Sequence, residues 1–298
     1  MAIHMITPIQ VTDATVRALY RAETALPPWV LESIREGLEK ESNPLARSQL
    51  QFMLENVGLA ESKGLPLCQD TGLPIFHVQM GRDLLLDFDL QEAIAEGVRR
   101  ATARIPLRPN AVDPLTRKNS LDNTGPGMPD IILDQVQGQS LRITAFPKGA
   151  GSENMSLVMM LNPADDPLQF IIDAVRERAA NACPPLFLGI GIGGSFDLAA
   201  RLAKHALLNM HALQLCSRKS SDRGGCAAPP VTSPEEVARL EGRLMKELNA
   251  LGIGPMGLGG DTTVLGLRIE KALCHTASLP VAINFQCWAN RSATEVIL

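Results

Sequence analysis

The sequence predicts a mixed α/β fold, with a helical N-terminal region over about residues 1–64 and a loop-rich α/β part over about residues 65–298. Two observations lead to this prediction. Apolar residues recur at helical spacing through the first third of the chain, between proline and glycine residues that mark helix ends. Further along, short apolar runs that end in glycine turns alternate with amphipathic helical patterns. The length of 298 residues allows one large or two moderate domains, and we treat the chain as a single domain.

The helices of the first third are predicted from their boundaries as much as from their periodicity. Residues 26–43 carry Pro27-Pro28 near their start, where proline is tolerated. Residues 43–64 continue the helical spacing and stop at Gly64. A third helix is expected over residues 90–105.

In the middle of the chain, the predicted elements change from helices to strands. Residues 131–136 and 141–146 are predicted to be strands, and the Gln-Gly-Gln-Ser link between them is typical of a hairpin. Residues 165–182 return to a helical pattern. Residues 185–194 indicate a strand that runs into a glycine turn, and a helix is expected to follow over residues 195–213.

The last third begins with a loop at residues 220–234. A strongly amphipathic helix follows over residues 234–252, with proline at its start and glycine after its end. Two further strands are predicted over residues 262–272 and 279–289.

Composition excludes several classes of function. The net charge is −4 without a long run of one sign, and aromatic residues make up only 4% of the chain, so neither the charge nor the stacking side chains of a nucleic-acid surface are present. No apolar run approaches about 18 residues, so no membrane span is predicted. The N-terminus lacks the basic start and long apolar centre of a signal peptide. We therefore expect a cytoplasmic protein.

The segment Gly-Ile-Gly-Ile-Gly-Gly at residues 189–194 matches the dinucleotide-binding pattern G-x-G-x-x-G between a predicted strand and helix. The acidic residue expected about 20 positions later is missing, since no Asp or Glu occurs between Asp197 and Asp222. A nicotinamide-dependent oxidoreductase is therefore an unfavoured alternative. These glycines could instead let a helix pack closely on a strand. Together with the glycine-rich residues 148–154 and 252–263, they could also expose backbone N–H groups to a small anion.

Three of the six cysteines lie where a regular element meets a turn: Cys68, Cys183 and Cys287. Each alone is more often an inert thiol, and the other cysteines lack such a setting. No C-x-x-C occurs, and a disulfide framework is not expected in a reducing cytoplasm. Together the three suggest a shared site for zinc or an iron–sulfur cluster. With three thiolates, one metal position has no protein ligand and can act as a Lewis acid. Such a metal position suits the removal of water from a hydroxy acid.

Several longer motifs span residues 66–291, which is most of the chain. They are PLCQDTG, PLRPNAVDP, RKNSLDNTGPGMPD, FPKGAGSEN, NACPPLFLGIGIGG, GIGPMGLGGDTT and HTASLPVAINFQCWANR. With these motifs the chain resembles the class I, iron–sulfur-dependent fumarase and L(+)-tartrate dehydratase family, in its α or N-terminal part. The resemblance implies that Cys68, Cys183 and Cys287 ligate a [4Fe–4S] cluster whose fourth iron faces the substrate.

The same resemblance implies roles for five further residues. It places Asp70 beside the open iron as a catalytic acid or base, and Gln69 in the same turn as a substrate-binding residue. It implies that Arg108 and the backbone N–H of Gly151 hold substrate carboxylates, and that His275 is a catalytic residue at the edge of the site. Arginine offers a bidentate fork to a carboxylate, which agrees with its implied role. Without the resemblance, Arg108 would be read as part of a surface ion pair and His275 as a satisfied loop histidine.

The implied reaction is reversible dehydration of (S)-malate to fumarate, with L(+)-tartrate or another small hydroxy-dicarboxylate as the alternative substrate. Ser120, Leu121 and Ala150 depart from common family residues, whereas GAGSEN and GLGGDTT are closer to the fumarase branch. Because the sequence ends eleven residues after Cys287, the resemblance also implies a separate β subunit and an α homodimer within an α2β2 enzyme. A non-catalytic metal-binding or assembly subunit is a third hypothesis.

Overall fold

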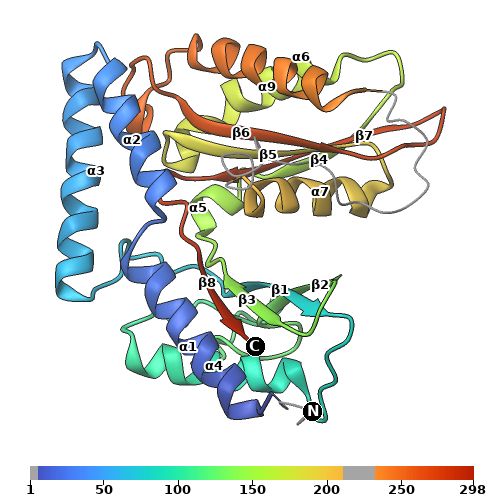
Figure 1. Cartoon of the computed structure of the whole chain (residues 1–298). Helices are drawn as coiled ribbons and strands as arrows, with labels where there is room; N and C mark the ends of the chain where they lie inside the picture. Colours follow the sequence, from blue (N-terminus) through green and yellow to red (C-terminus); the bar gives the residue numbers. More distant parts are fainter. Residues whose placement is uncertain (1–5, 211–231) are drawn as a thin grey trace. The chain divides into compact units, whose positions relative to one another are not determined.

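The computed structural model describes residues 6–210 and 232–298, which belong to two compact units (Figure 1). Unit 1 contains Met1–Leu31, Met53–Ala150 and Ala289–Leu298, and unit 2 contains Glu32–Phe52 and Gly151–Trp288. Each unit holds a mixed four-stranded sheet and helices, so the predicted mixed α/β class is confirmed. The expectation of a single α-subunit domain stays a prediction.

The helical N-terminal region is confirmed. Its three helices are α1 (Pro8–Thr24), α2 (Pro28–Lys40) and α3 (Pro44–Lys63), and each begins at a proline. Proline suits a first helical position because its missing N–H would have no partner there. Thr7 and Gln10 form a capping box before α1, which satisfies further N–H groups. The chain leaves α3 at Gly64, whose φ of 62° is accessible to glycine without strain.

The sheet of unit 1 has the order β2-β1-β3-β8. The helices α1 and α4 (Leu90–Arg104) pack against it through a core that includes Leu19, Phe76, Ile94 and Ile143, all fully or almost fully buried. The strands are β1 (Ile75–Gly81), β2 (Asp130–Val136), β3 (Leu141–Ala145) and β8 (Ala293–Ile297).

The predicted hairpin between residues 131–136 and 141–146 is wrong, although both strands exist. β1 lies between them, parallel to β2 and antiparallel to β3. β1 is almost entirely buried, so its backbone groups need partners on both edges. The link after β2 therefore passes around the end of β1, where the Gly81 N–H donates to the Ser140 carbonyl at 2.9 Å.

The sheet of unit 2 has the order β4-β7-β5-β6. Apolar residues of α6 (Pro167–Arg178) and α9 (Pro234–Asn249) share a core with the strands, and α7 (Phe196–Leu208) lies on the opposite face (Figure 1). The predicted helices and strands of this half are confirmed with shifted ends, and part of the predicted 220–234 loop lies outside the described residues. The strands are β4 (Leu157–Leu161), β5 (Leu186–Ile192), β6 (Val264–Lys271) and β7 (Leu279–Gln286).

The glycines of the G-x-G-x-x-G match have a packing role. Gly189 and Gly191 lie inside β5, where a Cβ atom would overlap the carbonyl oxygens of Ala203 and Ala199 in α7. A dinucleotide fingerprint needs its glycines in the turn, and only the third of the matching glycines, Gly194, lies there. The close approach of helix and strand therefore accounts for the first two glycines, and the nicotinamide alternative loses its main sequence support.

We expect Gly189→Ala to lower the free energy of unfolding by about 3 kcal/mol, because α7 must shift away from β5 to admit the methyl group. Gly242→Ala is the matched control, since Gly242 lies in α9 with nothing within 4 Å of its added Cβ. The control should gain up to about 1 kcal/mol from better helix propensity. Urea denaturation of the two variants checks both values, and equal stability would contradict the packing role.

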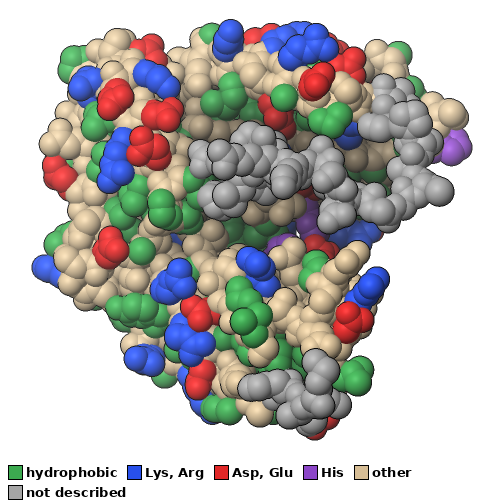
Figure 2. Space-filling view, in the orientation of Figure 1, with side chains coloured by type: hydrophobic (Ala, Val, Ile, Leu, Met, Phe, Trp, Pro, Cys, Tyr) green, Lys and Arg blue, Asp and Glu red, His purple; other side chains and the backbone are tan. Residues whose placement is uncertain are grey.

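None of the helices in the described part of the chain has the length and apolar character to cross a membrane. Basic and acidic side chains are interspersed over the face shown in Figure 2. That pattern agrees with the sequence, which has no long run of basic residues.

Candidate functional site

In unit 1, the segment PLCQDTG forms a tight turn between α3 and β1. Cys68 is partly exposed, and the Asp70 N–H donates to its sulfur at 3.4 Å. The Cys68 thiol lies 3.7 Å from Oε1 of Gln69, whose side chain is exposed. The buried Leu67 holds the start of the turn, and its carbonyl accepts from Nδ2 of Asn56 at 2.9 Å. The turn therefore presents a thiol beside a carboxylate from a fixed backbone.

The Asp70 carboxylate is oriented by two backbone donors. Its Oδ1 accepts from the Gly72 N–H at 2.9 Å, and its Oδ2 accepts from the Ala150 N–H at 2.7 Å. A Cβ atom on Gly149 would lie 3.1 Å from Oδ2, so glycine permits this approach. The turn and the FPKGAG segment are thus joined through the side chain of Asp70, for which the family resemblance implies a catalytic role.

The Arg108 loop lies against the same turn. The Arg108 N–H donates to Oγ1 of Thr71 at 3.0 Å, and Nδ2 of Asn110 donates to the Gly72 carbonyl at 3.1 Å. The buried Asn123 secures the loop from behind by donating to the Arg108 carbonyl at 3.1 Å. Arg108 itself is exposed, and its guanidinium has no hydrogen-bond or ion-pair partner within the part of the chain that the structure describes. It can therefore accept an anionic ligand.

Behind the turn lies a buried ion pair that the sequence does not reveal. Nη1 of Arg291 donates to Oε2 of Glu23 at 2.7 Å, and the two side chains are only 2% and 1% exposed. Nη2 of Arg291 donates to the Asp70 carbonyl at 3.0 Å. The Glu23 carbonyl accepts from the Leu67 N–H at 2.8 Å. Glu23 ends an amphipathic helix, where a glutamate is normally taken for a solvated residue, and Arg291 is visible only as the end of the WANR motif.

Burial raises the pKa of Glu23 to about 7, although the neighbouring Arg291 charge and its hydrogen bond act in the lowering direction. The negative charge of Asp70 adds a smaller raising effect. Desolvation disfavours the charged carboxylate, and the single arginine does not fully offset that cost.

We expect this shift to make stability depend on pH. Between about pH 4.5 and pH 7 the folded chain keeps the Glu23 proton while the unfolded chain loses it, so the free energy of unfolding falls as the pH rises. The fall reaches at most about 3 kcal/mol. Denaturant titrations of the wild type and Glu23→Gln across this range isolate the effect, since the variant cannot titrate at position 23. Glu32→Gln, an exposed carboxylate, is the control. A constant stability difference between wild type and Glu23→Gln would contradict the expectation.

In unit 2, Cys183, Cys287 and Gly151 come together. The Trp288 N–H donates to the Cys183 carbonyl at 3.4 Å, which ties the end of β7 to the Cys183 turn. A Cβ atom on Gly151 would lie 3.9 Å from Sγ of Cys183. Cys183 is exposed, and its backbone lies in the left-handed helical region, with φ 55° and ψ 63°. A non-glycine residue in this conformation is strained, and such residues cluster at functional sites.

The glycine-rich segment 252–263 supports the Cys183 turn. The Met256 N–H donates to the Pro184 carbonyl at 2.8 Å. Further N–H groups of this segment, those of Asp261 and Thr262, donate to the buried carboxylate of Glu41 at 2.9–3.0 Å. A carboxylate of the chain itself thus occupies two of the N–H groups that the sequence suggested for a small anion.

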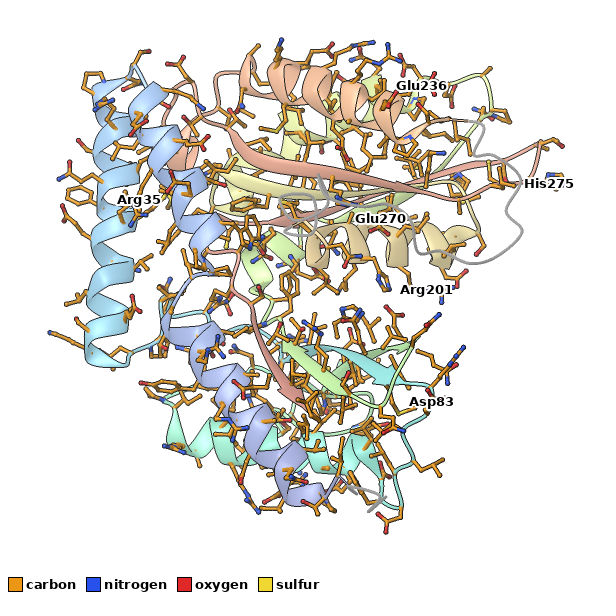
Figure 3. The ribbon with its side chains drawn as sticks, viewed as in Figure 1. Arg35, Asp83, Arg201, Glu236, Glu270 and His275 are labelled. Atoms are coloured by element: carbon orange, nitrogen blue, oxygen red, sulfur yellow. The ribbon has the colours of Figure 1, made fainter. Side chains whose placement is uncertain are left out.

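The structure does not bring His275 to these cysteines. It lies on the exposed turn between β6 and β7, where its Nδ1 accepts from the Ala277 N–H at 3.1 Å (Figure 3). The eight-residue strand β7 separates it from Cys287 within unit 2. A strand of that length spans about 27 Å.

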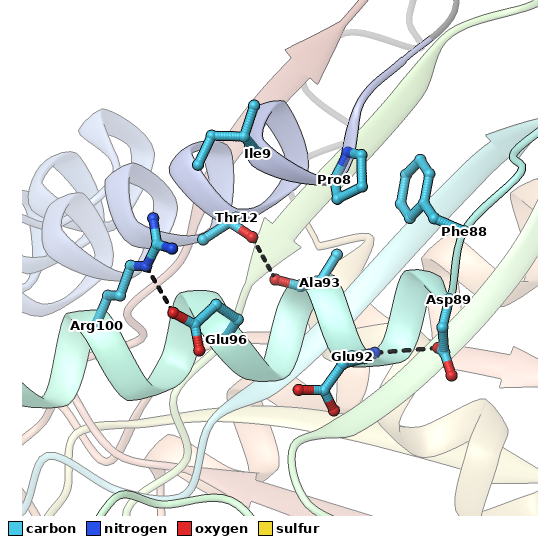
Figure 4. A pocket seen from close by; sticks show the side chains of 9 residues that line it. All are labelled: Pro8, Ile9, Thr12, Phe88, Asp89, Glu92, Ala93, Glu96 and Arg100. Carbon is cyan, nitrogen blue, oxygen red and sulfur yellow. Dashed lines mark hydrogen bonds and ion pairs between the residues drawn. The ribbon is translucent and has the colours of Figure 1, made fainter.

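Two cavities in the described part of the chain are lined by none of the predicted site residues. One of about 430 Å³ lies between α1 and α4 (Figure 4). There the Thr12 hydroxyl donates to the Ala93 carbonyl, and Arg100 pairs with Glu96. Another, of about 370 Å³, lies among residues 111–128 and is lined by Ser120, one of the positions that depart from the family pattern. The candidate site is therefore defined by its hydrogen-bonded turns.

Comparison with known proteins identifies the family of the chain. The family model described as "Fumarate hydratase (Fumerase)" matches residues 12–296. The chain is 43% identical to the "Putative L(+)-tartrate dehydratase subunit alpha" of Methanocaldococcus jannaschii, over 97% of this chain and 98% of the relative. It is 30% identical to the "L(+)-tartrate dehydratase subunit alpha" of Escherichia coli O157:H7, over 97% of this chain and 91% of the relative. The chain therefore belongs to the fumarate hydratase (Fumerase) family and is a hydro-lyase.

Proposed function

We propose that the chain is the α subunit of an iron–sulfur hydro-lyase that interconverts (S)-malate with fumarate and water. The observation that carries the proposal is the convergence, in unit 1, of the Cys68 thiol, the oriented Asp70 carboxylate and the loop that carries the exposed Arg108. Dehydration removes the hydroxyl from one carbon of malate and a proton from the next, which leaves the double bond of fumarate. A carboxylate for the proton and a cation for the substrate are the groups that this chemistry needs.

The proposed cofactor is a [4Fe–4S] cluster held by Cys68, Cys183 and Cys287. Within the described part of the chain, none of the three belongs to a disulfide, and thiolates are the usual cluster ligands. When bound, such a cluster supplies a Lewis acid at the iron that no cysteine occupies. The proposal requires Cys68 of unit 1 to meet the two cysteines of unit 2. The chain crosses from one unit to the other between residues 150 and 151 and again between residues 288 and 289. Gly151 and Cys287 stand next to these two crossing points in the sequence.

Each remaining residue has a role that follows from its chemistry. Arg108 holds a substrate carboxylate through its fork of N–H donors. Gln69 offers an exposed amide, and Gly151 offers its backbone N–H to the same class of oxygen. Asp70 holds or transfers a proton at its carboxylate, as the acid or the base. His275 stays a sequence-based prediction, because unit 2 holds it at the other end of β7 from Cys287.

The proposal includes a β subunit that completes the site, and an α homodimer within an α2β2 enzyme in the cytoplasm. The relatives from M. jannaschii and E. coli are both named as α subunits, which supports a separate partner chain. We expect cluster-loaded α alone to turn over malate at less than about 1% of the rate of the α and β chains together, since the second proton-transferring group is missing. Adding purified β to α in an anaerobic assay measures the gain. Full turnover by α alone would contradict a two-chain site.

A second candidate reaction is dehydration of L(+)-tartrate to oxaloacetate and water, favoured by the printed names of the relatives. The deciding experiment compares kcat/KM of the anaerobically reconstituted α and β chains on both substrates, with fumarate and oxaloacetate measured as products. A ratio of about ten or more for malate supports the main proposal, and the reverse ratio supports tartrate. A fully loaded enzyme that dehydrates neither would overturn both.

A further inference from the structure

The buried pair of Glu23 and Arg291 contacts the cysteine turn at both ends. Glu23 accepts from the Leu67 N–H through its backbone carbonyl, immediately before Cys68. Arg291 donates to the Asp70 carbonyl, two residues after Cys68. The two side chains are joined at 2.7 Å, so one connected pair fixes the backbone on either side of Cys68 and Gln69. We call this pair the clamp.

Stability alone does not account for the clamp. Burying two charges costs several kcal/mol per ion, and a pair regains that cost only when its remaining polar atoms are also satisfied. Within the described part of the chain, Oε1 of Glu23 and Nε of Arg291 are buried without a hydrogen-bond partner. Glu23 also lines a cavity of only about 10 Å³, near the smallest volume that holds a single water molecule. An apolar pair of similar size would serve stability as well or better.

We propose that Arg291, held by Glu23, is a positioning residue that fixes the Cys68–Asp70 turn for catalysis. Its catalytic consequence rests on the proposed hydro-lyase function. Arg291 fixes the Asp70 carbonyl, while the Gly72 and Ala150 N–H groups orient the Asp70 carboxylate. Together these contacts determine where the carboxylate and the neighbouring thiol point.

The geometry requires arginine at position 291. Nη1 binds Glu23 while Nη2 binds the Asp70 carbonyl, so the planar guanidinium spans two acceptors in different directions. Lysine keeps the charge but carries its donors on one nitrogen, so it lacks the planar fork that places Nη1 and Nη2 at the two acceptors. Arg291→Lys therefore separates the charge of the residue from its positioning role.

The test uses the full chain and measures two properties. Hydrogen exchange of the backbone amides of residues 67–72 reports the turn directly, with α4 as an internal reference. Steady-state kinetics of the reconstituted α and β chains report the catalytic consequence. Arg21→Lys is the matched control, since Arg21 joins α1 to Glu295 of β8 in the same unit but does not touch the turn.

For Arg291→Lys we expect amide exchange in residues 67–72 to be at least about tenfold faster, with α4 unchanged. We expect kcat to fall at least about tenfold and KM to stay within about threefold, because misplacement of reacting groups affects the chemical step. Arg21→Lys should match the wild type in both measurements. Wild-type exchange in the turn, or an unchanged kcat, would overturn the proposal.

Should Arg291→Lys fail to fold, the double variant Glu23→Leu/Arg291→Met decides the question. It removes both buried charges and keeps the Glu23 backbone carbonyl, so an uncompensated charge no longer prevents folding. Fast exchange in residues 67–72 with a low kcat supports the positioning role, and wild-type behaviour overturns it. If the wild-type enzyme dehydrates neither malate nor tartrate, only the proposed function is wrong. The exchange measurement still reports whether the clamp fixes the turn.

Discussion

Replacing Cys68, Cys183 or Cys287 by alanine is expected to abolish cluster binding and to lower activity by about a thousandfold or more. A cluster held by three thiolates loses a third of its protein ligands with each substitution, and the Lewis-acid contribution to the reaction disappears with the cluster. The measurement is anaerobic reconstitution with iron and sulfide, followed by an iron count and the cluster absorbance. The wild type should bind about four irons per chain.

Cys274→Ala is the matched control for this series. Cys274 belongs to unit 2 and is exposed like Cys183, but it precedes His275 in the turn between β6 and β7. We expect it to bind iron as the wild type does. A silent substitution at any of the three proposed ligands would remove that cysteine from the site. Cys216 and Cys226 lie outside the described residues.

Asp70→Asn is expected to lower kcat by about 100-fold or more, the usual contribution of a positioned acid or base. The amide cannot exchange a proton with the substrate. It also replaces one acceptor oxygen by an NH₂ group, which would face either the Gly72 or the Ala150 N–H and lose that hydrogen bond. Initial rates with malate and tartrate, normalised to iron content, measure the loss.

Asp89→Asn controls for a general effect of losing a carboxylate in unit 1. Asp89 caps α4 by accepting from the Glu92 N–H at 3.1 Å, and asparagine caps helices about as well as aspartate. Its kcat should equal that of the wild type. Asp70→Asn with full iron content and an unchanged kcat would show that Asp70 does not transfer the proton.

Sequence reasoning found α2 and α3 because their signals are local, although it set no bounds for α1. Pro28 and Pro44 begin α2 and α3, and Gly64 follows the end of α3, so a few neighbouring residues determine each boundary. Strand pairing has no such local signal. The link at residues 137–140 resembles a hairpin turn, yet β1, from about 60 residues earlier in the chain, takes the place between β2 and β3.

The candidate site likewise has residues that the sequence reveals and residues that it does not. Cys68, Asp70 and Arg108 stand in recognisable motifs, because their chemistry and their turns are encoded close together in the sequence. Glu23 was missed because its partner, Arg291, is 268 residues away and its burial depends on the packed unit. Asn123 was missed for a similar reason, since its bonds to Asn110 and Arg108 exist only after the loop has closed.

The order of segments in unit 1 has a consequence for biosynthesis. Every residue of unit 2, up to Trp288, is made before the last segment of unit 1, Ala289–Leu298. That segment contributes β8 to the edge of the unit 1 sheet and Arg291 to the back of the cysteine turn. Chains generally begin to fold from the N-terminus as they emerge. The surroundings of Cys183 and Cys287 are therefore available to fold first, and the Cys68 turn acquires its final support only after residue 291 has left the ribosome.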